Sequence, residues 1–202
     1  VDNADYSRPG DIENMLIPEL GRVYRKFLEQ GKKIFVNNKE VMIRDPLYLI
    51  PNSREVKTFG PSEERTHEII PLDGTTSLGT YLEEDGSASA IHVRMRRRRV
   101  EKIRPWIEEK TGTVAPAAAY NKEIRRWWCT TDHQGFSVIR NGRELAFGKT
   151  LGLWPKGTNQ YYNFAGLEIE FNSCADDLFR LENNKNRIGI TTKLRDKLDS
   201  LC

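Results

Sequence analysis

Apolar residues recur at helical spacing over the first thirty positions of the chain. Five of them form one stripe: Leu16, Leu20, Val23, Phe27 and Leu28. Such a stripe is typical of an amphipathic helix that turns one face toward a core. Asp11 can cap this helix at its start and Gly31 can end it, so the pattern predicts a helix from 11 to about 30.

Two later segments alternate strictly between apolar and polar residues, which is typical of half-buried strands. In the segment 91–96 the apolar set is Ile91, Val93 and Met95. In the segment 167–171 we expect Leu167, Ile169 and Phe171 to face the core. Glu168 and Glu170 should lie on the opposite face of the strand.

Two hairpins are predicted from their turn residues. Asn37-Asn38 separates the segment 33–36 from the segment 40–43. Asn141-Gly142 separates 135–140 from 143–147, and Asn-Gly is the strongest short hairpin signal.

The remaining positions are less regular, and their expected elements follow in chain order. They are loops with short strands at 67–71 and 78–83, a helix ending near 111, a connector at 112–119, an undefined aromatic and basic stretch at 120–128, a loop at 148–163, a short helix at 173–181 and a final helix from 192. This order lacks regular βαβ units and predicts an α/β (α+β) two-layer sandwich with a mixed sheet and helices on one face. The length fits a single domain over 1–202, with 51–90 as a loop-rich insertion.

Composition narrows the class of protein. Lys and Arg number 32 and Asp and Glu 29, so the net charge of +3 gives no argument for nucleic-acid binding from the total. No apolar run reaches the roughly 18 residues of a membrane helix, and the polar start at Val1 lacks a signal-peptide pattern and resembles a piece of a longer chain. Three widely spaced cysteines predict no disulfide framework and favour a reducing, cytoplasmic compartment without a membrane partner.

Two short motifs invite a chemical interpretation that their surroundings disfavour. Gly148-Lys149-Thr150 ends like a phosphate-binding loop, but Arg143 stands where that loop needs its first glycine, and no helix is expected after Lys149. Cys129 and His133 are four positions apart, but no further ligand has matching spacing, so no metal is expected.

The run from Arg94 to Arg99 is the best binding candidate from the residues alone. In a strand, alternation would place Arg94, Arg96 and Arg98 on one face, where guanidinium groups could contact successive phosphates of DNA. The alternative is a solvated face whose charge is balanced within the protein by Glu101, Glu108 and Glu109.

Three segments together carry a resemblance to a known family. They are 20–28 with the hairpin 33–45, the hairpin 135–145, and the stretch 166–171 followed by Leu178-Phe179 and Asn183-Asn184-Lys185. In this order they resemble the second domain of GHKL-type ATPases, the histidine kinase-like ATPase family, as found in bacterial relatives of microrchidia-like proteins and, more widely, in MutL and gyrase B.

The resemblance implies a transducer domain of the ribosomal protein S-five-like type, with a left-handed crossover. It also implies that Lys185, next to Asn184 in a polar loop, contacts the γ-phosphate of ATP held by an upstream domain. Asn186 stands where the relatives often carry glutamine. The family's nucleotide pocket, with its Asn-bearing helix and Asp-x-Gly-x-Gly loop, has no counterpart in these 202 residues.

Two functions of different class follow. In the first, the chain senses ATP and magnesium bound in the upstream domain and passes a conformational change to a homodimer or a nucleic-acid clamp. This fragment would then not be an enzyme, although the full-length chain would be an ATPase. In the second, the chain is a stand-alone nucleic-acid or protein interaction module with no nucleotide role.

Overall fold

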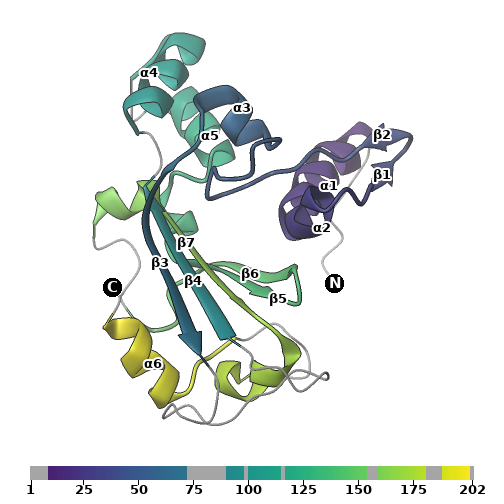
Figure 1. Cartoon of the computed structure of the whole chain (residues 1–202). Coiled ribbons are helices and arrows are strands. Elements are labelled where there is room, and N and C mark those ends of the chain that lie inside the picture. Colours follow the sequence, from purple (N-terminus) through teal and green to yellow (C-terminus); the bar gives the residue numbers. More distant parts are fainter. Residues whose placement is uncertain are drawn as a thin grey trace.

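A five-stranded mixed sheet forms the centre of the computed structural model, which describes residues 9–71, 90–97, 100–114, 117–153, 159–180 and 188–200. The strand order is β3-β4-β7-β5-β6 (Figure 1). The strands are β3 (Glu63–Pro71), β4 (Ala90–Arg97), β5 (Phe136–Arg140), β6 (Arg143–Lys149) and β7 (Ala165–Phe171). β5 and β7 are parallel and every other neighbouring pair is antiparallel, so the mixed α/β architecture is confirmed.

The helices and a small second sheet surround this centre. The helices are α1 (Pro9–Val23), α2 (Arg25–Glu29), α3 (Arg54–Phe59), α4 (Val100–Thr111), α5 (Ala118–Arg126) and α6 (Thr192–Asp199). The 3₁₀ turns are η1 (Thr131–His133), η2 (Gln160–Phe164) and η3 (Ser173–Phe179). The second sheet is the hairpin of β1 (Phe35–Val36) and β2 (Lys39–Glu40). Among the described helices, none has both the length and the apolar character needed to cross a membrane.

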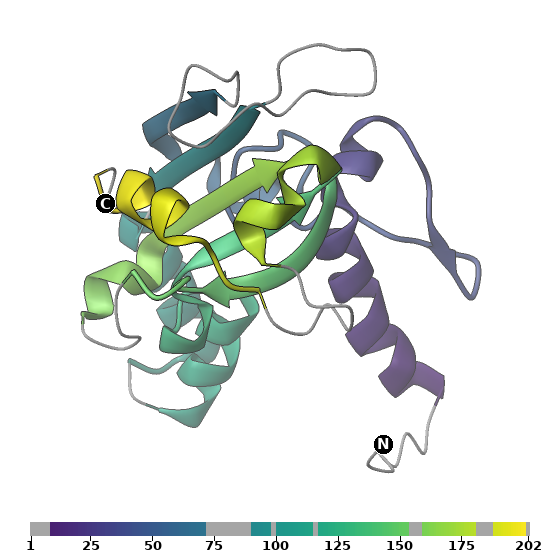
Figure 2. The same cartoon turned by 90° about the horizontal axis from the view of Figure 1, so that it is seen from below.

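One face of the large sheet is apolar and carries the main core. Ile169 and Phe171 of β7 are buried there, and Leu167 packs against them. η3 and α6 cover this face through Leu178, Phe179, Leu194 and Leu198, and Figure 2 shows both elements lying over the strands. The predicted alternation of β7 is confirmed, because it is a local consequence of the two-residue period of a strand.

A second apolar cluster lies where α3, α4 and α5 gather beyond one end of the sheet (Figure 1). The Trp127 ring makes edge contacts with Phe59 at 4.7 Å and with Trp106 at 5.4 Å between ring centroids. Aromatic pairs of this geometry add to the free energy gained from burial alone. The undefined stretch 120–128 is therefore mostly helix, and its tryptophans join α5 to this cluster.

Helices contact both faces of the sheet, which corrects the expectation of helices on one face. Glu168 projects from β7 on the side opposite Ile169, and Arg25 of α2 reaches it with an N···O distance of 3.0 Å. Alternation assigns a polar residue to this face but does not say whether water or another element covers it.

The segment 51–90 was expected to be a loop-rich insertion, but its described residues, 51–71 and 90, form mostly regular elements. Ser53 caps α3, because its hydroxyl accepts from the backbone N–H of Val56, and β3 supplies a full strand of the large sheet. The predicted strand at 67–71 is the second half of β3, and only its polar first half, 63–66, was missed. The expected strand at 78–83 lies outside the described residues.

Most other local predictions hold. Both hairpins form, and their turns place Asn37, Asn38 and Asn141 at positive φ, which asparagine tolerates. The first helix is interrupted at Tyr24 and divides into α1 and α2. The final helix begins after Thr191, whose side chain accepts from the N–H of Leu194.

Candidate functional site

The predicted nucleotide-sensing loop, with Asn184 and Lys185, lies outside the described residues. The structure does describe its base, between η3 and α6. The backbone N–H of Thr191 donates to the carbonyl of Leu178 at 2.9 Å, which ties the two ends of the loop together.

Of the three arginines predicted to bind nucleic acid, Arg98 is also outside the described residues, and the other two turn inward. Arg94 pairs with Glu168 at 3.3 Å, and its side chain is 30% exposed. Arg96 is only 6% exposed and is held within the protein. The partner of Arg94 is a carboxylate of β7, a strand 74 positions away, and not one of the glutamates that follow the run. The described part of β4 therefore presents no open row of guanidinium groups.

A buried ionic network joins α2 to the sheet. Arg25 is 1% exposed and donates to Glu144 at 2.6 Å, Ser137 at 2.5 Å and Glu168 at 3.0 Å. The Ser137 hydroxyl donates to Glu144 as well, at 2.6 Å. Buried charges are tolerated only when they are paired and hydrogen-bonded in this way.

Glu168 is the carboxylate on which this network converges. Lys26 at 3.0 Å and Arg94 at 3.3 Å both contact its Oε1, while Arg25 contacts its Oε2. Burial alone would raise the pKa of Glu168, but the positive charges of Arg25, Lys26 and Arg94 outweigh burial and lower the pKa to about 2. The carboxylate is therefore ionised at neutral pH, which makes it a structural anchor and excludes it as a general acid.

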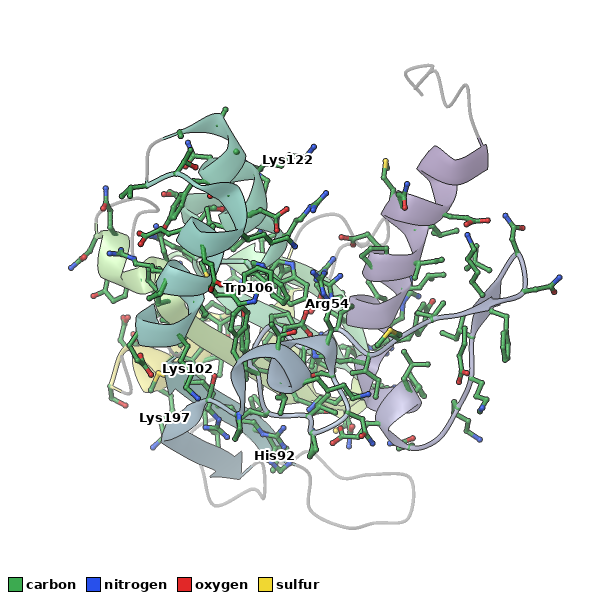
Figure 3. All side chains as sticks on the ribbon, turned by 90° about the horizontal axis from the view of Figure 1, so that it is seen from above. Arg54, His92, Lys102, Trp106, Lys122 and Lys197 are labelled. Atoms are coloured by element: carbon green, nitrogen blue, oxygen red, sulfur yellow. The ribbon has the colours of Figure 1, made fainter. Side chains whose placement is uncertain are left out.

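A second charged feature is a cleft between α1 and the α3 and α5 helices, which we call the arginine cleft. Its volume is about 850 Å³, and its lining is Asn14, Met15, Pro18, Glu19, Arg44, Arg54, Arg125, Arg126 and Trp128. Figure 3 shows the labelled Arg54 side chain between α1 on one side and the α4 and α5 pair on the other. Four guanidinium groups thus face a space that has one carboxylate, Glu19, in its lining.

The four arginines of the cleft are held differently. Arg44 is buried, donates to Glu55 at 2.7 Å and lies 4.8 Å above the Trp128 ring. Arg54 lies 4.1 Å above the Trp127 ring, and within the described residues no carboxylate forms an ion pair with it. Burial lowers the pKa of Arg54, and the charge of Arg44 lowers it further. Arg44, Arg125 and Arg126 each pair with a carboxylate, whereas Arg54 has Glu55 and Glu123 only as nearby charges, so Arg54 is the arginine of the cleft whose charge is least balanced among the described residues.

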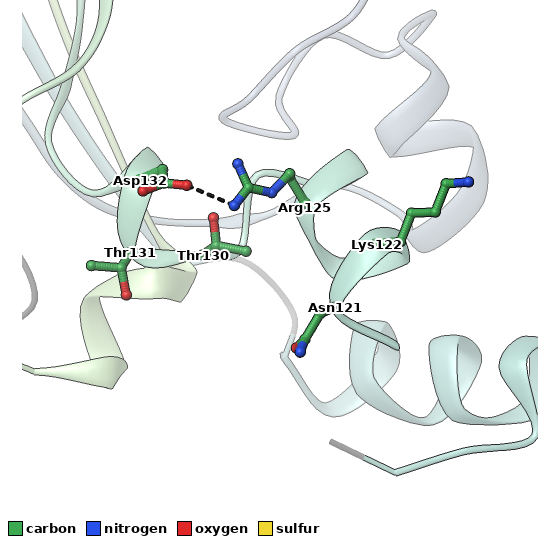
Figure 4. A pocket seen from close by; sticks show the side chains of 6 residues that line it. All are labelled: Asn121, Lys122, Arg125, Thr130, Thr131 and Asp132. Atoms are coloured by element: carbon green, nitrogen blue, oxygen red, sulfur yellow. Dashed lines mark ion pairs between the residues drawn. The ribbon is translucent and has the colours of Figure 1, made fainter. Parts of the chain in front are cut away.

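A smaller hollow shares Arg125 with the cleft, and Figure 4 shows the residues that line this hollow. Its volume is about 540 Å³, and its lining adds Asn121, Lys122, Thr130, Thr131 and Asp132. Arg125 pairs with Asp132 at 2.8 Å, and both side chains are more than 60% exposed. An ion pair exposed to this degree contributes little stability and exchanges readily for another anion.

The residues of the two disfavoured motifs, the phosphate-loop-like stretch 148–150 and the pair Cys129 and His133, have structural roles or lie at the surface. Lys149 ends β6 and is exposed, and the described residues directly after it, 150–153, are not helical. Cys129 is buried with its thiol toward the Trp127 carbonyl, and His133 contacts Thr130 at 2.9 Å. Over the described ranges, no three His, Cys, Asp or Glu side chains gather as a metal site would require.

Apart from Arg94, which belongs to the buried network, no residue of the network or of the arginine cleft was among the predicted site residues. The cleft is assembled from positions 44, 54 and 125–126, which no sequence spacing connects. The network had a partial signal in the sequence. Arg25 and Lys26 lie off the apolar stripe of their helix, and Glu168 alternates with the apolar residues of its strand.

Comparisons with protein families, with curated proteins and with solved structures return no match to the chain.

Proposed function

We propose that the chain is the transducer part of a GHKL-type ATPase and adopts a ribosomal protein S-five-like fold. The observation that carries this proposal is the place of Arg25. It belongs to the first of the three segments that resemble the family, and it contacts Ser137 and Glu144 of the second and Glu168 of the third. Segments recognised separately in the sequence therefore meet in one buried network.

The arrangement of the sheet supports the same proposal. The β5–β6 hairpin turns at Asn141-Gly142, and β7 returns beside β5 in the parallel direction. η3 and α6 then pack on the apolar face, and the segment 181–187, which carries Lys185, lies between them in the sequence. A signal received at that loop has a direct covalent route to both elements.

In the proposed function, ATP and magnesium are bound by an upstream domain of the longer protein, and Lys185 approaches the γ-phosphate. A lysine ammonium near a phosphate in a closed site interacts more strongly than it would in water, because the local dielectric constant is lower. Closure would stabilise one orientation of this domain, and a homodimer or nucleic-acid clamp would receive the change.

The test is the ATPase activity of the full-length protein with Lys185→Ala. Loss of a charge-assisted contact predicts a fall in kcat of roughly 10- to 100-fold. Lys193→Ala is the matched control. Lys193 is an exposed lysine in the first turn of α6, eight positions after Lys185. Wild-type turnover in the Lys185 variant would refute the proposed role.

A further inference from the structure

The arginine cleft holds donor groups that form no ion pair among the described residues. Arg44 is fixed from two sides, because Glu55 accepts from its Nε and the Arg126 carbonyl accepts from its Nη2 at 3.2 Å. It therefore forms a charged floor. Arg54 lies against Trp127 with its guanidinium edge unoccupied by any described carboxylate. Stacking on an aromatic ring leaves the in-plane N–H groups of an arginine free to bind an anion.

The two outer arginines are accessible and lightly held. The side chain of Arg126 is 52% exposed and pairs with Glu123, while Arg125 pairs with Asp132 at the surface. Because exposed pairs are worth little in water, a ligand with a higher charge density can take their place. Guanidinium groups match the paired oxygens of a phosphate, which gives them two parallel hydrogen bonds per group.

The shape favours a long anion over a small one. The cleft and the hollow share Arg125, so the cationic side chains Arg54, Arg126, Arg125 and Lys122 line two neighbouring spaces, against two carboxylates, Glu19 and Asp132. Thr130 and Thr131 add hydroxyl groups along the second space (Figure 4). A chain of phosphates can satisfy donors spread over both spaces, whereas a compact ligand would fill one of them.

We propose that the arginine cleft and its adjoining hollow form a groove that binds the phosphate backbone of a nucleic acid. The binding is independent of base sequence, because the lining offers contacts suited to phosphates and no open aromatic face: Trp128 is buried beneath Arg44. This inference rests on the part of the proposed function that includes a nucleic-acid clamp. It names the surface with which such a clamp would bind.

The experiment measures the affinity of the 202-residue chain for labelled single-stranded and duplex DNA at two salt concentrations, without ATP. The test variant is the triple change Arg54→Gln, Arg125→Gln and Arg126→Gln. The control removes three exposed lysines elsewhere, Lys32→Gln, Lys193→Gln and Lys197→Gln, so that the net charge falls equally. A third variant, with lysine at the three arginine positions, keeps the charge and removes the paired geometry.

The test variant should lose affinity by at least about tenfold at low salt, and its salt slope should flatten by roughly 2 on single strands and 2.7 on duplex. The control should keep the wild-type slope, and the lysine variant should recover it. If circular dichroism shows that the triple variant is unfolded, Arg125→Gln alone carries the test, because this side chain is 64% exposed and supports no core contact.

Three results would overturn the inference. One is equal affinity of the test and control variants. Another is competition by poly-glutamate as effective as that of DNA at equal charge, which would mark the groove as a site for acidic peptides. The last is absence of binding at low salt. None of these results depends on Lys185 or on ATP turnover, so failure of the groove and failure of the nucleotide-sensing proposal can be told apart.

Discussion

Replacing Glu168 with glutamine removes one negative charge from the buried network and leaves its cations in place. Arg25, Lys26 and Arg94 all face this carboxylate, and Glu168 is 2% exposed. A folded pKa of about 2 against the ordinary 4.5 corresponds to about 3 kcal/mol at pH 7, at roughly 1.4 kcal/mol per pKa unit. Mutational losses of buried ion pairs have the same size, about 3 to 5 kcal/mol.

The stability contributed by Glu168 should fall as the pH is lowered. Because the folded pKa is lowered, the ionised carboxylate stabilises the protein fully above pH 4.5, and the contribution disappears as the pH falls toward 2. The difference between wild type and Glu168→Gln in the free energy of unfolding should therefore be about 3 kcal/mol at pH 7 and about 2 kcal/mol at pH 3.5.

Urea unfolding followed by tryptophan fluorescence measures this difference at each pH. Glu40→Gln is the control, because Glu40 pairs with Lys33 at an exposed site and its loss should cost less than about 1 kcal/mol. A difference for Glu168→Gln below about 0.5 kcal/mol at pH 7, the scale of surface changes, would refute the reasoning. So would a difference that stays constant between pH 5 and pH 3.5.

Two further predictions concern packing. Ile169→Ala should lower the free energy of unfolding by about 2 to 5 kcal/mol, because the side chain is fully buried between the sheet and η3 and α6; a loss below about 0.5 kcal/mol would contradict its core position. Gly21→Ala should cost more than about 1 kcal/mol in the same assay, because its Cβ would lie 2.2 Å from the Met42 carbonyl oxygen. Gly10→Ala is the matched control, since nothing lies within 4 Å of that Cβ, and an alanine there should be neutral or stabilising by up to about 1 kcal/mol. Equal effects at the two glycines would contradict the close approach of α1 to the segment after β2.

The sequence predicted the elements whose signals are local. Asn141-Gly142 specifies a hairpin by its own backbone preferences, and the alternation around Ile169 specifies a strand and its buried face. α3 also had a local signal, Ser53 at its N-cap, but six residues of helix give too little periodicity to be recognised. β3 lies at an edge of the sheet, where its polar sequence is tolerated.

The candidate sites were harder to predict because they are made of distant residues. Alternation places Glu168 and Arg94 on one face, but only the tertiary fold shows that α2 covers that face and neutralises it. Arg94 and Arg96 were expected on an open face, whereas Arg94 pairs with Glu168 and Arg96 is buried. The arginine cleft depends on the approach of α1 to α3 and α5, and neither helix carries a pattern that specifies its partner.

The position of Arg25 also constrains how the chain can change through evolution. One guanidinium satisfies Glu144, Ser137 and Glu168 at once, so a neutral residue in its place would bury two carboxylates with fewer cations. A neutral residue at either glutamate would leave the reverse imbalance. A single neutral substitution at any of these three charged positions should therefore cost more stability than a paired change that removes one positive and one negative charge together.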